Sequence, residues 1–242
     1  MGPTLGAAAV TGTARRRTGA VGRILAALVM ALVATPQAAA QDDTDAHLWT
    51  QVVATLQPTD DWRVHLELQP RWFDNVTASF QILGRAAVGR RVHDRTVVWG
   101  GYAVVAKPPG PGTAYEQRVW QQLTTSAAPR AGWTPSLRLR LEQRTQAGWD
   151  NWSHRGRVLA RANRALSKNW SLSLWNETFV TFDRTARGPK QGFDQNRLAT
   201  MMMRRLATGV GLETGYVWVA HETSPGRVLN NHVWLTSLSV TR

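Results

Sequence analysis

The sequence predicts an all-β protein, a closed antiparallel up-and-down transmembrane β-barrel of 10 to 12 strands. Apolar and polar residues alternate along repeated segments of roughly ten to fourteen residues, which is the pattern of a strand with two different faces. The connections between segments are short and long in turn, and tryptophans stand near both ends of the segments. Short turns at one end, longer loops at the other and two aromatic girdles are typical of outer-membrane barrels.

The first 40 residues are expected to be a secretory signal peptide. Four arginines precede an apolar run at residues 24–34, and small residues follow it up to Ala40. This order is typical of an export signal, and the run is too short for a membrane-spanning helix. A retained anchor or a buried helix is the alternative. We therefore expect cleavage of residues 1–40 and one barrel domain over residues 41–242.

The composition excludes several classes of protein. Residues 1–40 hold four of the 29 Lys and Arg residues and none of the 16 acidic residues, so the remainder carries a formal net charge of +9. The basic residues are spread at strand spacing and accompany no recognition motif, so no nucleic-acid partner is expected. The chain has no cysteine, which excludes disulfides and cysteine-ligated metals.

Eleven segments show the strand pattern. The ranges are 46–57, 62–73, 79–92, 96–107, 114–127, 132–146, 153–166, 169–182, 194–206, 209–221 and 228–242. Bacterial single-chain barrels normally have an even number of strands, so the odd count is a conflict. Either the first segment does not span, which gives ten strands, or the N-terminus or the loop after Asp183 hides another, which gives twelve.

The clearest alternation is LRLRLEQRT at residues 137–145. It predicts that Leu137, Leu139 and Leu141 face lipid while the charged residues between them face the lumen. The same rule applied to every segment gives a lumen charge network of Arg63, Glu67, Arg71, Arg85, Glu116, Arg118, Arg138, Arg140, Glu142, Arg144, Arg155, Arg157, Arg161, Glu177, Arg197 and Glu213.

Tryptophans are expected to form the two girdles at headgroup height. Three follow short turns and three lie near the opposite ends of hairpins: Trp62, Trp133 and Trp170, then Trp72, Trp149 and Trp152. A soluble periplasmic β-sandwich would explain the alternation equally well, but it would more often place tryptophans in the middle of strands.

Several strings resemble successive blocks of the family called domain of unknown function 2490. They are YEQRVWQQLTT (115–125), LRLRLEQRT (137–145), SLWNETFVTF (173–182), GFDQNRLATMMMRR (192–205), GLETGYVW (211–218) and NNHVWLTSLSV (230–240). The blocks keep their order over essentially the whole of residues 41–242, and NE and FDQNR are the most specific. The resemblance implies an outer-membrane β-barrel and names no reaction.

The charged inner face is the candidate functional surface. In a narrow lumen the Arg and Glu side chains would brace and plug the barrel, or would form an anion-preferring passage or an anionic-ligand site. A candidate rim site brackets the longest loop: Asn176, Glu177, Asp194, Gln195, Asn196 and Arg197. A cross-strand pair of Glu177 and Arg197 that fixes the register is the alternative.

The sequence does not favour an enzyme. A nucleophilic Ser needs an oriented His within hydrogen-bond reach, and the nearest pairs are His221 with Ser224 and His154 with Ser153. We expect no catalytic residues, no metal and no cofactor. Expected partners are outer-membrane lipid and the barrel assembly machinery, and the oligomeric state is open. An outer-membrane enzyme or binding protein acting on lipid or lipopolysaccharide is the competing function.

Overall fold

The computed structural model describes residues 44–77, 80–107, 114–224 and 227–242. The proposed signal peptide lies outside the described residues. No helix in the described part of the chain is long and apolar enough to cross a membrane.

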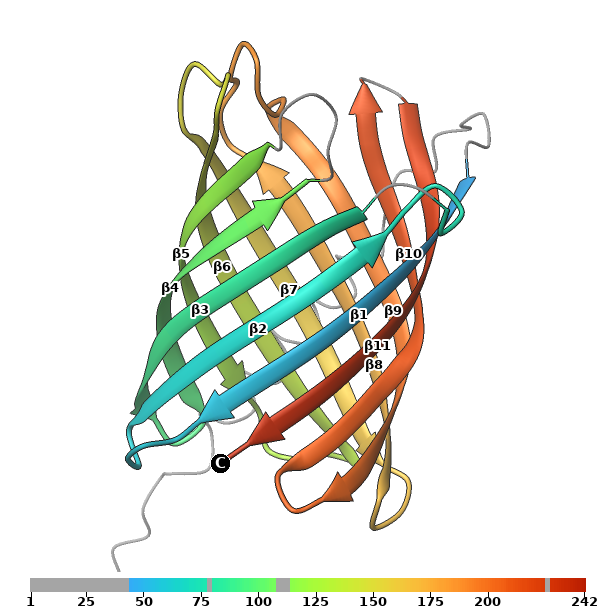
Figure 1. Cartoon of the computed structure of the whole chain (residues 1–242). Helices are drawn as coiled ribbons and strands as arrows, with labels where there is room; N and C mark the ends of the chain where they lie inside the picture. Colours follow the sequence, from blue (N-terminus) through green and yellow to red (C-terminus); the bar gives the residue numbers. More distant parts are fainter. Residues whose placement is uncertain (1–43, 78–79, 108–113, 225–226) are drawn as a thin grey trace, which may run out of the picture.

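Eleven strands make up the described part of the chain. They are β1 (Thr44–Leu56), β2 (Trp62–Trp72), β3 (Phe80–His93), β4 (Thr96–Ala106), β5 (Tyr115–Ser126), β6 (Trp133–Gln146), β7 (Ser153–Ala165), β8 (Trp170–Thr181), β9 (Gly192–Ala207), β10 (Val210–Ser224) and β11 (Arg227–Thr241). Each strand ends within three residues of its predicted boundary. The strands close into one barrel, which confirms an all-β closed barrel of 10 to 12 strands and excludes the two-sheet sandwich (Figure 1).

The odd strand number is real in the described residues, and the parallel pairing of β1 with β11 accommodates it. Consecutive strands are antiparallel, so with eleven strands the first and the last run in the same direction. They pair in parallel from Thr44 beside Asn230 to Thr55 beside Thr241. The expectation of an even number is therefore wrong, because β1 spans 13 residues and pairs on both sides.

The two ends of the barrel differ. The loop end carries the longer connections, among them residues 147–152 and 182–191, and the turn end carries short ones such as 208–209 (Figure 1). Gly209 has φ 72°, and a Cβ there would collide with the Thr241 carbonyl, so this turn requires glycine. The alternation of loop length predicted from sequence is present for most connections, but 127–132 at the turn end is as long as 147–152, and only two residues separate β10 from β11 at the loop end.

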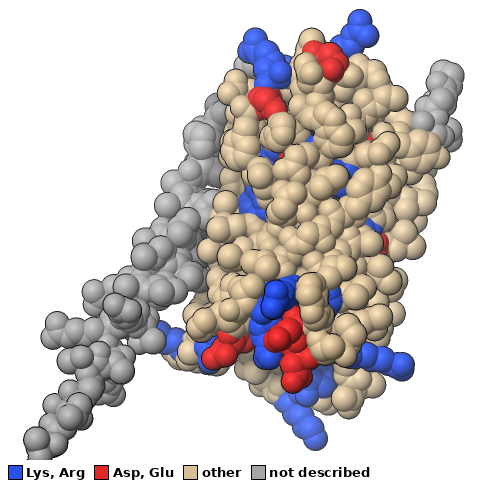
Figure 2. Space-filling view, turned by 90° about the vertical axis from the view of Figure 1, so that its left-hand side faces the viewer, with Lys and Arg blue, Asp and Glu red and all other residues tan. Residues whose placement is uncertain are grey.

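Side chains sort by the two-residue period of each strand. Large apolar residues such as Leu66, Leu68 and Leu198 are about half exposed on the outer face. In Figure 2 most of the visible face is uncharged, and Lys, Arg, Asp and Glu gather towards its two ends. The interior holds an apolar cluster on β1, β9, β10 and β11, made of Trp49, Ala199, Met201, Val217, Val219, Val233 and Leu235.

Candidate functional site

The inner face of β6, β7 and β8 carries a group of charges that are buried except for the partly exposed Arg138, and we call them the central ion network: Arg138, Arg140, Glu142, Arg155, Arg157 and Glu177. Glu142 is only 1% exposed and accepts hydrogen bonds from Arg155 Nη2 and Arg157 Nη1, both at 2.6 Å. Glu177 of β8 is 2% exposed and accepts from Arg138 Nη2 at 2.6 Å. Arg157 Nη2 lies 2.7 Å from Glu177 Oε1 and so joins the two carboxylates.

Aromatic rings inside the barrel pack against these guanidinium groups. Arg157 and Arg197 lie over Phe179 at 4.4 and 4.6 Å, and Arg140 lies over Trp120 at 4.2 Å. Trp120 is 1% exposed and Phe179 is also 1% exposed. Guanidinium groups stack well on aromatic faces. Sequence reasoning assigned these rings no role, although their parity with Arg118 and Glu177 already puts them on the inner face.

The remaining predicted lumen residues form smaller groups. Glu67 pairs with Arg85 at 2.5 Å, Glu116 pairs with Arg118 at 2.9 Å, and Glu213 pairs with Arg161. Arg63 lies apart from the network near the turn end, where its Nη1 donates to the Asp60 carbonyl at 3.4 Å.

Two of the predicted arginines are held by amides and rings. Arg71 donates to the side chains of Gln69 and Gln81, and Arg197 donates to Gln195 at 3.2 Å. Both guanidinium groups also lie over the ring of Trp49, at 4.4 and 4.9 Å.

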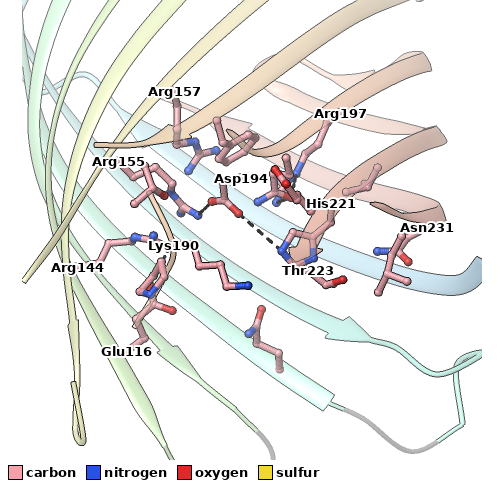
Figure 3. Close-up of a pocket in the computed structure, with 18 of the residues that line it drawn as sticks. Glu116, Arg144, Arg155, Arg157, Lys190, Asp194, Arg197, His221, Thr223 and Asn231 are labelled. Atoms are coloured by element: carbon pink, nitrogen blue, oxygen red, sulfur yellow. Dashed lines mark hydrogen bonds and ion pairs between the residues drawn. The ribbon is translucent and has the colours of Figure 1, made fainter. Parts of the chain in front are cut away.

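Two cavities occupy the lumen, one towards each end. The loop-end cavity is about 760 Å³ and is lined by residues such as Arg144, Lys190, Asp194 and His221 (Figure 3). The turn-end cavity is about 470 Å³ and is lined by strand residues alone, including Gln51. Between them stand Trp120, Phe179 and the central ion network.

The residues of the predicted rim site lie on both faces of the sheet. Glu177 and Arg197 are register partners on the inner face, whereas Asn176 and Asn196 point outwards and hydrogen-bond to each other at 2.9 Å. Asn176 also lies in the middle of β8 and not at its rim. The prediction of one site is wrong, because neighbouring residues on a strand face opposite sides.

A β-bulge explains why Asp194 belongs to the inner group. The register of β8 with β9 shifts between Phe179 and Val180, so Phe179 pairs with Gln195 and Val180 pairs with Phe193. The extra residue, Asp194, lines the loop-end cavity together with Gln195. Its Oδ2 accepts from Arg155 Nη1 at 2.8 Å, and its Oδ1 lies 3.7 Å from His221 Nε2 (Figure 3).

Glu177 and Arg197, the proposed register pair, are opposite each other but bond to other residues. Glu177 and Arg197 face each other across β8 and β9, but Glu177 is bonded to Arg138 and Arg157, and Arg197 is bonded to Gln195. Between the described side chains of Glu177 and Arg197 no ion pair forms, since two other guanidinium groups already satisfy the carboxylate.

Trp149, one of the six predicted girdle tryptophans, faces the lumen, and the girdle at headgroup height stays a prediction for the other five. Trp62, Trp152 and Trp170 are 45%, 48% and 42% exposed, and Trp72 and Trp133 are half-buried. Trp149 instead lines the loop-end cavity, with Arg144 over its ring at 6.0 Å. It stands in a connection and not in a strand, so strand parity does not govern its direction.

Of the two His and Ser pairs considered for catalysis, His154 and Ser153 face opposite sides of β7. Ser153 is buried on the inner face, and His154 lies on the outer face, where Nδ1 is 2.5 Å from Asp183 Oδ2. Burial raises the pKa of the Asp183 carboxyl, but the hydrogen bonds from His154 outweigh it and leave this pKa below its ordinary value. The side chain of Ser224 lies outside what the structure describes. The described residues contain no cluster of three or more metal-ligating His, Asp or Glu side chains.

Comparison with known proteins gives a family and no activity. The family described as "Protein of unknown function (DUF2490)" matches residues 46–230. An uncharacterized protein from Methylorubrum extorquens is 28% identical over 222 residues, which cover 90% of this chain and 97% of that protein. No solved structure matches the chain. With the match extending from β1 into β11, the chain belongs to the DUF2490 family.

Proposed function

We propose that the chain is an outer-membrane β-barrel protein whose lumen is closed in its middle by the central ion network. Residues 1–40 direct export, the barrel assembly machinery inserts the barrel, and lipid surrounds its outer face. Its role is structural or concerns restricted permeability, and it is not a permanently open pore.

The observation that carries this proposal is the reversed polarity of the barrel wall. On β6 the outward Leu139 and Leu141 are 42% and 40% exposed, while the inward Arg140 and Glu142 are 6% and 1% exposed. A protein in water gains by burying leucine and hydrating charge. In water, exposed leucines and buried charges would both be unfavourable. Lipid around the outer face makes the exposed leucines favourable, and a closed barrel satisfies its backbone groups there through neighbouring strands.

The closed lumen is supported by the arrangement of charges and rings. Carboxylates and guanidinium groups fill the middle of the barrel at 2.6 to 3.0 Å from each other. Separating buried ion pairs costs several kcal/mol per uncompensated charge. Thermal motion alone therefore opens the passage rarely.

The test is ion conductance of the folded protein in a planar bilayer, with a salt gradient to read selectivity. We expect a silent membrane containing protein that migrates as a compact species on cold gels and as an unfolded species after heating. Discrete anion-selective steps that shrink in Arg138→Gln plus Arg140→Gln would overturn the closed lumen. Recovery of the unheated protein in the soluble fraction, with no change of gel mobility, would overturn the membrane location.

A further inference from the structure

The loop-end cavity holds more positive than negative charge. Nine Lys or Arg residues line it against four Asp or Glu residues, an excess of five formal positive charges. The turn-end cavity has four arginines against two glutamates, an excess of two. Glutamates outside the lining compensate Arg85 and Arg157, but Arg71, Arg144 and Arg197 have no carboxylate within hydrogen-bond distance in the described part of the chain. Buried charge without a close counter-charge is costly, so the loop-end cavity is the stronger attractor for an anion.

Arg144 is the guanidinium group with the most unused donors in this cavity. Its residue is 4% exposed, and among the described residues Nε and Nη2 have no hydrogen-bond partner. Its contact with Glu116 is long, 3.7 Å from Nη1, because Arg118 Nε takes the same carboxylate oxygen at 2.9 Å. Arg155, by contrast, is saturated by Glu142 and Asp194.

Other polar groups surround the same space. Thr181 is 1% exposed, and its Oγ1 is without a hydrogen-bond partner in the described part of the chain. Lys190 comes from the 182–191 loop, and Figure 3 shows it together with Arg144 and Asp194 around the cavity. The site therefore combines a buried guanidinium fork, a hydroxyl and a lysine from an exposed loop.

We propose that the loop-end cavity binds the phosphate group of a phosphorylated ligand, with Arg144 as its anchor and Lys190 as a second cation. A phosphate monoester carries close to two negative charges and three acceptor oxygens, which suits a cavity with a large positive excess. Adjacent guanidinium donors bind two oxygens of such a group at once. A cavity of about 760 Å³ also has room for the body of a sugar-sized ester.

The phosphate group could reach the cavity on a soluble ester or on a lipid headgroup, and the chemistry of the site is the same for both. The inference goes beyond the proposed function and holds whether or not the barrel conducts ions. Its failure and the failure of the closed lumen are distinguishable, since one is read from binding and the other from conductance.

The experiment is titration calorimetry of the folded protein in uncharged detergent micelles. The probes are inorganic phosphate, glucose 6-phosphate, and micelles doped with phosphatidic acid or lipopolysaccharide, with chloride at matched ionic strength and glucose as controls. We expect binding of at least one phosphorylated probe and none of chloride or glucose. Saturation by glucose 6-phosphate indicates a soluble source, and saturation only by doped micelles indicates a lipid source.

Variants locate the site. Arg144→Gln should weaken binding about tenfold or more, the effect of losing a charge-assisted pair of hydrogen bonds. Arg164→Gln is the matched control, because it removes the same charge from β7 where Arg164 lies over Trp133, away from the cavity. It should bind as the wild type does.

Three results would overturn the proposal. The first is no binding of any phosphorylated probe, and the second is unchanged binding by Arg144→Gln. If Arg144→Gln does not fold, as judged by gel mobility, Lys190→Gln decides, because this loop side chain is exposed and is not needed for the strands. In that case, unchanged affinity for the phosphorylated probes in Lys190→Gln is the third result that would overturn the proposal.

Discussion

The two faces of β6 place opposite kinds of side chain only one residue apart. Leu137, Leu139 and Leu141 look outwards, and Arg138, Arg140, Glu142 and Arg144 look inwards, where all but Arg138 are less than 7% exposed. Each inward charge has a partner on another strand, Arg138 on β8 and the others on β5 or β7, whereas the outward leucines contact the surroundings of the barrel. Charge is therefore tolerated where counter-charges are fixed in advance, and the outer face has no such counter-charges on β6.

The inner face is itself divided between two walls. The charged residues concentrate on β6, β7 and β8, and the wall of β9, β10, β11 and β1, which continues the sheet from β8, supplies the apolar cluster around Met201 and Val217. Low-dielectric surroundings strengthen the ion pairs and raise the cost of leaving one charge unpaired. The same charge should thus have very different effects on the inner face, on the outer face and at the rim.

The largest effect is expected from removing one carboxylate on the inner face. Glu142→Gln leaves Arg155 and Arg157 with less counter-charge while both stay buried. Breaking a buried ion pair on one side costs about 3 to 5 kcal/mol. The free energy of unfolding, from urea titration followed by tryptophan fluorescence in lipid vesicles, should fall by that amount.

Glu213→Gln is the matched control on the same face. In the described residues Glu213 pairs only with Arg161, and their side chains are 19% and 30% exposed, so water can replace the lost partner. We expect a loss of about 1 kcal/mol. Equal losses in Glu142→Gln and Glu213→Gln would show that the central ion network is not special.

The next effect concerns a charge placed on the outer face. Leu139→Arg puts a guanidinium group near the middle of β6, where lipid is the proposed surrounding. Such a substitution near the bilayer midplane costs about 2 to 4 kcal/mol. The same urea titration measures it.

The depth of the substituted residue gives the control for Leu139→Arg. Leu206 is also exposed, at 50%, but it lies at an irregularity of β9 next to the turn that follows this strand. Leu206→Arg should cost about 0 to 1 kcal/mol, because charge near the interface stays hydrated. A neutral Leu139→Arg would contradict the assignment of this face to lipid.

The strands and their faces were predictable because both depend on local alternation. Residues such as Leu139 and Glu142 reveal their side of the sheet through their immediate neighbours, and closure was expected because a lipid-facing sheet cannot leave an edge unpaired. The count of eleven strand segments was also correct. The usual even number of strands in bacterial barrels led to the wrong expectation of ten or twelve.

The details of the site were not predictable, because they depend on features without a period. The bulge that turns Asp194 inwards changes the parity of β9 after Phe193, and no residue there marks it. Trp149 and Lys190 reach the loop-end cavity from connections, where alternation has no meaning. Arg144 keeps hydrogen-bond donors without a partner in the described residues because Arg118 lies closer to the Glu116 carboxylate. The sequence does not give these distances.

The smallest effect is expected at the rim, where charge meets water. Asp183 follows β8 and accepts hydrogen bonds from the backbone and side chain of His154. Both side chains are exposed, so Asp183→Asn should cost only about 0.5 kcal/mol at neutral pH. Folding lowers the pKa of Asp183, so its contribution is complete above the ordinary value of 3.8 and disappears as the pH falls through the folded-state pKa. The wild type and Asp183→Asn should therefore differ in urea titrations at pH 7 and converge in acid. A difference that grows in acid would mean that the carboxyl group acts in its protonated form, and that this rim contact is not an exposed ion pair.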